Sequence, residues 1–299
     1  MSRILLTGAN GFLGKSIATH LSTDFIVDTI GRKKADIVVD LAKDQPHLTE
    51  SYTYIIHAAG KAHSVPKTDA EKQDFFDVNL TGTQNLLNAL DNAPHLPKYF
   101  VFISSVSVYG AETGNLIAEN APLQAKDPYG ESKIRAEQLI YEWCAQRNVV
   151  CTVLRLPLLA GTNPPGNLGA MIKGIKKGYY FNISGGSAKK SIVLAEDIAK
   201  TVLTAAKIGG TYNLTDRYHP SFKELSECIA KQLNKSKPLS MPLFIAKLMA
   251  GTGDLIGNKF PINSKSLNKI LSDLTFDDSS AVKAFGWNPT PVLKGFKIA

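Results

Sequence analysis

A glycine-rich turn follows the first apolar run of the chain, and few folds place such a turn there. The apolar run spans residues 4–7, the turn contains Gly8, Gly11 and Gly14, and a helical pattern follows over residues 15–21. Glycines at this spacing permit a tight turn, let the backbone approach a pyrophosphate and let the helix pack closely on a sheet. The start of the helix offers free N–H groups and a positive dipole end to phosphates. The turn therefore predicts a dinucleotide site, and a purely structural loop is the alternative.

The first half of the chain alternates short apolar runs with longer amphipathic patterns. This alternation is typical of βαβ units and a parallel sheet, and continuous apolar strands suit a sheet covered on both faces. We therefore predict a Rossmann-type, doubly wound α/β fold with a dinucleotide-binding domain over residues 1–160, to which residues 190–206 return. Residues 161–299 are expected to form a smaller, mostly α substrate-binding region. The expected strands span residues 4–7, 25–30, 37–39, 54–57, 99–104 and 149–154, and the expected helices 15–21, 70–77, 82–90 and 129–147.

The composition of the 299 residues is that of an ordinary globular protein, with 44% hydrophobic and 20% charged residues, and it excludes disorder. The net charge of +8 is spread along the chain in short runs. These runs lack the interleaved aromatic residues that nucleic-acid binding requires, so a small anionic partner is favoured and no nucleic acid is expected. The three cysteines form no CxxC pair and no cluster with histidine. We therefore expect no metal site, no disulfide framework and a reducing, cytoplasmic location.

No apolar run reaches the ~18–20 residues that a bilayer span requires, and the N-terminus has no signal-peptide pattern. Membrane association is therefore not expected. The apolar stretch over residues 243–256 is broken by Lys247, Gly251 and Asp254. It is interpreted as a buried helix pair, with an interfacial membrane helix as the weaker alternative.

The segment from Tyr129 to Lys133 gives the strongest indication of chemistry. A tyrosine and a lysine four residues apart share one face of a helix. A lysine ammonium beside a phenol favours the phenolate and lowers the pKa of the phenol. Such a tyrosine can give or take a proton near neutral pH. Ser105 follows an expected strand and is placed at the sheet edge where ligands bind, so we predict that it polarises the same substrate oxygen.

The residues after the second expected strand indicate which dinucleotide binds. An acidic residue usually holds the adenosine ribose about 20 positions after the glycine turn. Here Asp28 lies inside the strand and the strand is followed by Arg32 and two lysines. This basic cluster suits a 2′-phosphate, so the cofactor is NAD or NADP, with NADP favoured by Arg32. A solvated basic turn is the alternative.

Several ordered motifs make the chain resemble the extended short-chain dehydrogenase/reductase family, which contains nucleotide-sugar epimerases, dehydratases and reductases. The glycine turn resembles the family's TGxxGxxG motif, and Tyr129 with Lys133 its YxxxK motif. Residues 57–60, 78–83, 103–110 and 285–289 resemble further family motifs. The cofactor-binding residues implied by this resemblance and by the turn are Gly8, Asn10, Gly11, Phe12, Leu13, Gly14, Arg32, Asp40, Leu41, Ala58, Ala59, Gly60, Asn79, Ser104, Tyr129, Lys133 and Pro157.

Departures from the family pattern help to choose the reaction. Family dehydratases carry an Asp-Glu pair after the strand-end serine, because elimination of water needs an extra base and an extra acid. Here those positions are Val106 and Ser107, so dehydration is disfavoured. Leu158 stands where many 4-epimerases have asparagine, which weakens the analogy to an epimerase without excluding it. The expected activity is NAD(P)-dependent hydride transfer at C4 of a UDP-sugar, by a 4-keto reductase or a 4-epimerase. The candidate substrate-binding residues are Ser105, Tyr129, Asn167, Lys190 and Arg217.

Other interpretations stay open at this point. A non-catalytic NAD(P)-binding sensor could use the same fold. A sugar on a lipid carrier could be the substrate, with residues 243–256 near a membrane. A homodimer is expected, with Leu139, Ile140 and Trp143 at the interface, and the alternative is that these side chains pack on the sheet.

Overall fold

The computed structural model describes residues 2–62, 64–256 and 263–298, and its centre is a sheet of seven parallel strands. The strands lie in the order β3-β2-β1-β4-β5-β7-β11, so the direction in which the chain adds strands reverses between β1 and β4. In such sheets ligands bind beyond the carboxyl ends of the strands at this reversal. The strands are β1 (Arg3–Thr7), β2 (Ile26–Gly31), β3 (Ile37–Val38), β4 (Tyr54–His57), β5 (Tyr99–Ser105), β7 (Val150–Leu156) and β11 (Gly210–Asn213).

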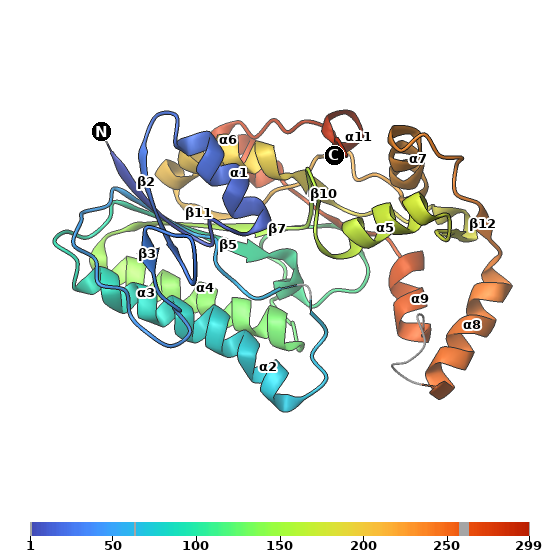
Figure 1. The fold of residues 1–299 in the computed structure, drawn as a ribbon, viewed down its shortest axis with the longest axis horizontal. Coiled ribbons are helices and arrows are strands. Elements are labelled where there is room, and N and C mark those ends of the chain that lie inside the picture. Colours follow the sequence, from blue (N-terminus) through green and yellow to red (C-terminus); the bar gives the residue numbers. More distant parts are fainter. Residues whose placement is uncertain (1, 63, 257–262, 299) are drawn as a thin grey trace.

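Helices cover both faces of this sheet (Figure 1). On one face lie α1 (Phe12–Leu21) and α6 (Ala195–Ile208), and on the other lie α3 (Gly82–Asp91) and α4 (Pro128–Arg147). Successive strand side chains point to opposite faces. Ile4 and Leu6 therefore enter the core under α1 and α6, whereas Leu5 enters the core under α3 and α4. This arrangement confirms the predicted α/β fold and explains why the strands are apolar throughout.

The two helices expected over residues 70–77 and 82–90 are parts of one continuous helical segment. Here α2 (Asp69–Phe76) passes into α3 through a π-helical turn at Asp77–Thr81. Such turns interrupt helices rarely and often occur at functional sites. Asn79 lies within the turn and is buried.

A smaller region follows the sheet and holds most of the remaining elements. The chain first returns to the sheet through α6 and β11, and Trp287 near its end packs in the core under α1 and α6. Its indole N–H donates to the carbonyl of Thr215 at 3.1 Å. The other elements are β6 (Gly114–Ile117), β8 (Leu158–Ala160), α5 (Gly166–Lys177), β9 (Asn182–Ile183), β10 (Ile192–Leu194), α7 (Phe222–Gln232), β12 (Ser240–Met241), α8 (Leu243–Ile256), α9 (Ser264–Leu271), β13 (Leu274–Phe276), α10 (Ser279–Phe285) and α11 (Val292–Gly295).

The interpretation of residues 243–256 as a buried helix pair is wrong. These residues form the single helix α8, which lies at one end of the molecule beside α9 (Figure 1). Only Ala246, Ala250 and Gly253 of this helix are buried. Phe244 and Leu248 are 73% and 74% exposed. The apolar composition of the segment is therefore not explained by a core.

Two residues proposed for a dimer interface are part of the protein's own core. Ile140 and Trp143 are buried against the sheet, and the Trp143 indole N–H donates to Asp91 at 3.0 Å. The alternative expectation for these two side chains is confirmed. The homodimer itself stays a prediction.

Candidate active site

The turn after β1 has a shape that requires its glycines. Gly8 has a positive φ of 74°, and a Cβ on it would lie 2.6 Å from the backbone nitrogen of Ala59. A Cβ on Gly14 would lie 2.0 Å from the carbonyl oxygen of Gly8. Any side chain at these two positions would separate β1, β4 and α1. No side chain caps the N-terminus of α1, whose N-cap residue is Gly11. The first N–H groups of this helix are therefore available to an anion.

A groove with a volume of about 1180 Å³ lies beside this turn. It is large enough for an extended dinucleotide, since typical small-molecule sites have volumes of about 300–1,000 Å³. The free helix N-terminus and the side chains of Lys15 and Lys43, which also line the groove, suit a diphosphate. The cofactor residues predicted from sequence that line the groove are Gly8, Asn10, Gly11, Arg32, Asp40, Leu41, Ala58, Ala59 and Gly60.

Asn10 links the glycine turn to the basic cluster that follows β2. Its side-chain amide donates to the carbonyls of Lys33 and Lys34 at 2.9 and 3.2 Å. Arg32 is exposed and lines the groove. Asp28, by contrast, forms an ion pair with Arg3 at 2.7 Å, in agreement with its predicted position inside the strand. The end of β2 thus presents positive charge to the groove.

The other predicted cofactor residues do not all face this groove. Leu13 is buried in the core, and Phe12 lies against Gly161. The Ser104 hydroxyl donates to Glu137 at 2.5 Å, so its side chain belongs to a buried network. Pro157 separates β7 from β8. A cofactor contact from Ser104 would have to use its backbone.

Asn79 fixes the loop that carries Gly60. Its side-chain oxygen accepts from the backbone N–H of Lys61 at 2.7 Å, and its amide donates to the Lys61 carbonyl at 3.1 Å and to the Ser132 hydroxyl at 2.9 Å. This residue therefore ties the loop after β4 to the first turns of α4. Its position agrees with a supporting role at the groove.

Sequence reasoning assigned no role to the side chain of His57, at the end of β4. The ring is completely buried between the hydroxyls of Thr7 and Thr83, at 2.6 and 2.9 Å. The Thr7 hydroxyl also accepts from the N–H of Ala59 at 3.0 Å. Burial, together with the nearby positive charge of Lys133, lowers the pKa of His57 to about 3. A histidine at the end of an otherwise apolar strand is the sequence signal that could have identified this position.

Tyr129 is placed by the start of α4. Asp127 is the N-cap residue, its carboxylate accepting from the N–H of Gly130 at 3.1 Å, and Pro128 occupies the first helical position. These are the residue types that begin helices. Tyr129 therefore lies in the first turn, with its ring centroid 6.1 Å from that of Phe75 on α2.

Lys133 lies one turn further along α4 and is buried. Its ammonium donates to the carbonyl of Ile103 in β5 at 2.9 Å and lies 4.5 Å from the centre of the Phe102 ring. Burial lowers the pKa of Lys133 to about 8, and the Glu137 carboxylate partly opposes this effect. A Cβ on Gly60 would lie 3.2 Å from the ammonium, so Lys133 meets the loop after β4.

The expected acidification of the Tyr129 phenol is wrong for this structure. Burial raises the pKa of Tyr129 above its ordinary value of 10, whereas a hydrogen bond with Ser105 lowers it and the charge of Asp127 raises it. The ammonium of Lys133 is held by the β5 backbone instead. The protonated phenol is therefore the stable form here.

Ser105 ends β5 at the carboxyl edge of the sheet, as predicted. Its hydroxyl accepts from the N–H of Ser107 at 3.1 Å, which caps a short 3₁₀ helix at Val106–Tyr109. The interaction with Tyr129 links its hydroxyl to the start of α4. Ser105 and Tyr129 thus lie together at the start of α4, and Lys133, one turn further along this helix, meets the loop after β4.

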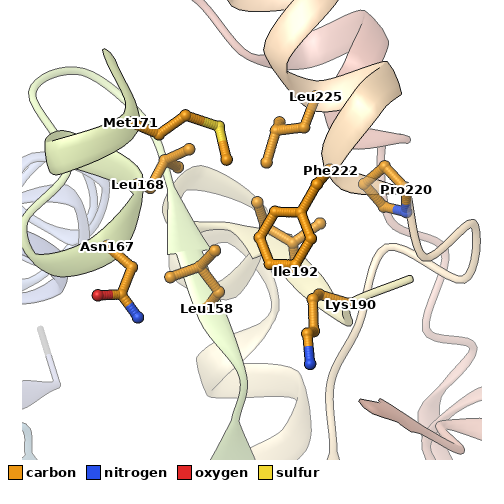
Figure 2. Close-up of a pocket in the computed structure, with 9 residues that line it drawn as sticks. All are labelled: Leu158, Asn167, Leu168, Met171, Lys190, Ile192, Pro220, Phe222 and Leu225. Atoms are coloured by element: carbon orange, nitrogen blue, oxygen red, sulfur yellow. The ribbon is translucent and has the colours of Figure 1, made fainter. Parts of the chain in front are cut away.

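Two of the three further substrate residues predicted from sequence share a small cavity of about 40 Å³. Figure 2 shows Asn167 and Lys190 with their polar ends toward the same side of an apolar pocket that includes Leu158. The Lys190 ammonium donates to the carbonyls of Lys269 and Ser272 at 2.9 and 2.8 Å, so it also holds the end of α9. Arg217 does not line this cavity; its guanidinium lies 3.8 Å from the Asp278 carboxylate.

The fold and the site geometry agree with a comparison of the sequence with known families. The sequence profile of the NAD dependent epimerase/dehydratase family matches residues 4–214. The chain belongs to this family. The prediction of an enzyme of the extended short-chain dehydrogenase/reductase type is thereby confirmed.

Relatives within the epimerase/dehydratase family match most of the chain. The N-acetyl-alpha-D-glucosaminyl-diphospho-ditrans,octacis-undecaprenol 4-epimerase of Escherichia coli O157:H7 is 26% identical over 92% of this chain and 87% of its own. The UDP-glucose 4-epimerase of Vibrio cholerae is 26% identical over 98% of this chain and 93% of its own. The structure of UDP-glucuronic acid 4-epimerase from Bacillus cereus, with UDP-glucuronic acid and NAD, has a TM-score of 0.75 at 19% identity and covers 98% and 96% of the two chains. This structural likeness shows the shared fold.

A buried ion pair lies on the elements that carry the predicted catalytic residues. Arg155 of β7 pairs with Glu137 of α4 at 2.7 Å, and both side chains are almost completely buried. Glu137 also accepts from Ser104, and Arg155 donates to the Tyr109 hydroxyl at 3.1 Å. The pair fixes α4 against β5 and β7. It therefore also fixes the position of Lys133 relative to the sheet.

Proposed function

We propose that this protein transfers a hydride at C4 of a UDP-sugar, as a 4-keto reductase or a 4-epimerase. The observation that carries the proposal is the link between Ser105 and Tyr129, with Lys133 one turn further along α4 beside Gly60, a residue that lines the dinucleotide-sized groove. Family membership supports an NAD(P) cofactor. The dinucleotide, when bound, accepts a hydride from the sugar carbon or returns one to it.

Different residues of the groove bind different parts of the dinucleotide. Gly8, Gly11 and the free N–H groups of α1 hold the diphosphate. Asp40 and Leu41 both line the groove and bind the adenine end of the dinucleotide. Arg32 holds a 2′-phosphate, which favours NADP. Lys133 holds the nicotinamide ribose beside Gly60, since its ammonium reaches that loop.

Tyr129 moves the proton on the reacting oxygen. Its raised pKa keeps the phenol protonated, and this is the form that can protonate the oxygen of a keto sugar during reduction. The Ser105 hydroxyl stands beside it and polarises the same oxygen. The positive charge of Lys133 opposes the build-up of negative charge when the phenol gives up its proton. The three residues together supply the proton transfer.

The residues after Ser105 restrict the reaction class. Val106 and Ser107 form part of the 3₁₀ helix, and the backbone N–H of Ser107 bonds to Ser105. Neither side chain can serve as the acid and base that loss of water requires. The proposal therefore covers reduction and epimerisation and leaves dehydration aside.

The test removes the phenol hydroxyl of Tyr129 and keeps its aromatic ring. Tyr129→Phe should lower turnover of UDP-sugars by about 10²–10⁴-fold, while the affinity for NAD(P)H, measured by fluorescence, stays unchanged. Tyr141→Phe changes a tyrosine of the same helix outside the site and should leave turnover intact. Unchanged turnover in Tyr129→Phe would contradict the proposal, and cofactor binding without any turnover in the wild type would point to a sensor.

The turnover assay also distinguishes a reductase from an epimerase. A reductase consumes one NAD(P)H for each sugar converted, whereas an epimerase converts sugars with no net consumption. Chromatographic separation of the C4 epimers, with NADPH followed by absorbance, gives both quantities. The charge of Arg32 favours the reductase.

A second candidate substrate carries its sugar diphosphate on a polyprenol in place of a nucleoside. The Escherichia coli relative is named for such a substrate, and the exposed apolar helix α8 favours this reading. The chemistry at the sugar would be the same, with the same three residues. Turnover of a polyprenyl-diphosphate sugar in detergent, with no turnover of UDP-sugars, would support this candidate over the first.

A further inference from the structure

Exposed large apolar side chains gather on one helix of this protein. Of the fifteen such side chains in the described part of the chain, five lie on α8: Phe244, Ile245, Leu248, Leu255 and Ile256. Single exposed apolar residues are common on protein surfaces, but contiguous groups mark interaction sites. The concentration of exposed large apolar side chains on this 14-residue helix therefore requires an explanation.

The two sides of α8 have different side chains. Ala246 and Ala250 are buried and pack with Leu267 of α9. Phe244, Leu248 and Leu255 are 73%, 74% and 89% exposed. At 3.6 residues per turn these three side chains fall within about 40° of one another around the helix. The small residues face the protein, and the large apolar residues form a continuous outer stripe.

Further exposed apolar side chains lie outside this helix. Leu239, just before β12, is 71% exposed. Its carbonyl accepts from the N–H of Asn182 at 2.9 Å, which places it beside β9. Tyr179 and Phe181, which precede β9, are also exposed. Exposed apolar side chains therefore also occur on the two segments that precede β9 and β12.

The charge near this surface is positive. Residues 231–256 contain four lysines, at positions 231, 235, 237 and 247, and one acidic residue, Asp254. Lys237 also pairs with Glu227 of α7 at 2.8 Å. The Asp254 carboxylate accepts from the backbone N–H of Ser264 at 3.0 Å and so is engaged at the start of α9. Lys176 and Lys177 end α5, just before Tyr179. An apolar stripe fringed by lysines complements a surface that is apolar inside and anionic at its boundary.

We propose that α8 and the lysines beside it dock this protein on an anionic phospholipid bilayer. The helix would lie in the plane of the interface, with Phe244, Leu248 and Leu255 among the acyl chains and Lys247 at the headgroups. Its 14 residues span about 21 Å, less than the ~30 Å hydrocarbon core. No helix in the described ranges has the length and apolarity to span a bilayer. Docking therefore means lying on the membrane.

The charge argues against a second copy of the chain as the occupant. If two copies met through α8, the lysines near α8 in one copy would lie close to those of the other, and like charges repel. An anionic bilayer would attract the same lysines. The expectation of no membrane association rested on the lack of a spanning apolar run and on the interpretation of residues 243–256 as a buried helix pair, and the structure shows that this segment is an exposed helix.

The experiment is co-sedimentation of the full-length protein with lipid vesicles. Vesicles of phosphatidylcholine and phosphatidylglycerol in equal parts should pellet the protein, and vesicles of phosphatidylcholine alone should leave most of it in the supernatant. Phe244→Gln with Leu248→Gln should lower the partition coefficient by at least about tenfold, because two apolar side chains no longer enter the bilayer. Ile208→Gln, at an exposed site on α6, is the matched control and should bind like the wild type.

A second set of variants tests whether the lysines contribute to vesicle binding. Lys235→Gln with Lys237→Gln and Lys247→Gln should lower binding to the anionic vesicles and reduce its dependence on salt. Circular dichroism verifies that each variant is folded. Vesicle binding needs neither cofactor nor substrate, so it can fail while the proposed reaction holds, and the reverse.

Three results would overturn the proposal. The wild type could stay in the supernatant with anionic vesicles, or the α8 variant could pellet as well as the wild type. The wild type could also be an oligomer in gel filtration that the α8 variant converts to monomer, which would assign this surface to a second copy.

Discussion

The Nε2 atom of His57 lies 2.9 Å from the hydroxyl oxygen of Thr83. The Thr83 hydroxyl donates its only proton to the carbonyl of Asn79 at 2.6 Å, so it must accept from the histidine. His57 is therefore protonated on Nε2, and its Nδ1 accepts from Thr7 at 2.6 Å. One neutral ring thus joins the end of β1, the loop after β4 and the π-helical turn around the cofactor groove.

The acid stability of the protein should depend on His57. Its pKa falls from an ordinary 6.5 to about 3 in the folded protein, so between these values only the unfolded chain binds the proton. Stability is therefore lost as the pH falls from about 6.5 to about 3, by on the order of 5 kcal/mol. His57→Gln keeps a neutral donor and acceptor and should lose less. Urea unfolding of the wild type, His57→Gln and the exposed-site control His95→Gln across this range measures the difference, and equal losses would refute the assignment.

Lys133 should have a related effect at alkaline pH. Burial lowers its pKa from 10.5 to about 8, so the folded protein releases this proton before the unfolded chain does. The wild type should gain stability relative to Lys133→Met as the pH rises from about 8 to about 10.5, by on the order of 3 kcal/mol. Denaturant titrations at several pH values give the difference. A constant difference would show that Lys133 keeps its ordinary pKa.

The buried ion pair should be costly to break. Glu137→Leu leaves Arg155 buried without its carboxylate and removes the acceptor of Ser104, so we expect a loss of about 3–5 kcal/mol in the free energy of unfolding. Glu131→Leu removes the exposed partner of Arg135 on the same helix and should change stability by less than about 1 kcal/mol. Chemical denaturation compares the two variants. Similar losses in both would mean that burial of the pair contributes little.

Arg32 should set the preference between cofactors. Arg32→Ala should raise the KM for NADP about ten- to a hundredfold, which corresponds to the loss of a charged hydrogen bond, and leave the KM for NAD nearly unchanged. Steady-state kinetics with both cofactors provides the measurement. Lys207→Ala, at an exposed site at the end of α6, serves as the control. If the wild type prefers NAD, or if both KM values rise together, the 2′-phosphate assignment is wrong.

The sequence alone determined those features that depend on local chemistry. The glycine turn could be predicted because a positive φ at Gly8 and the close contact at Gly14 tolerate no side chain. The strand and helix order followed from apolar runs that face two helix layers. The face shared by Tyr129 and Lys133 followed from helical periodicity. Each of these features is set by residues near one another in the chain.

Only the tertiary structure decided the features that depend on distant partners. The direction of the Tyr129 pKa was mispredicted because burial raises this pKa, while the lysine ammonium is held by the carbonyl of Ile103. The exposure of α8 was mispredicted because an apolar helix has the same composition whether a core or solvent covers it. Burial and hydrogen-bond partners are set by segments far apart in the chain, and periodicity carries no information about them.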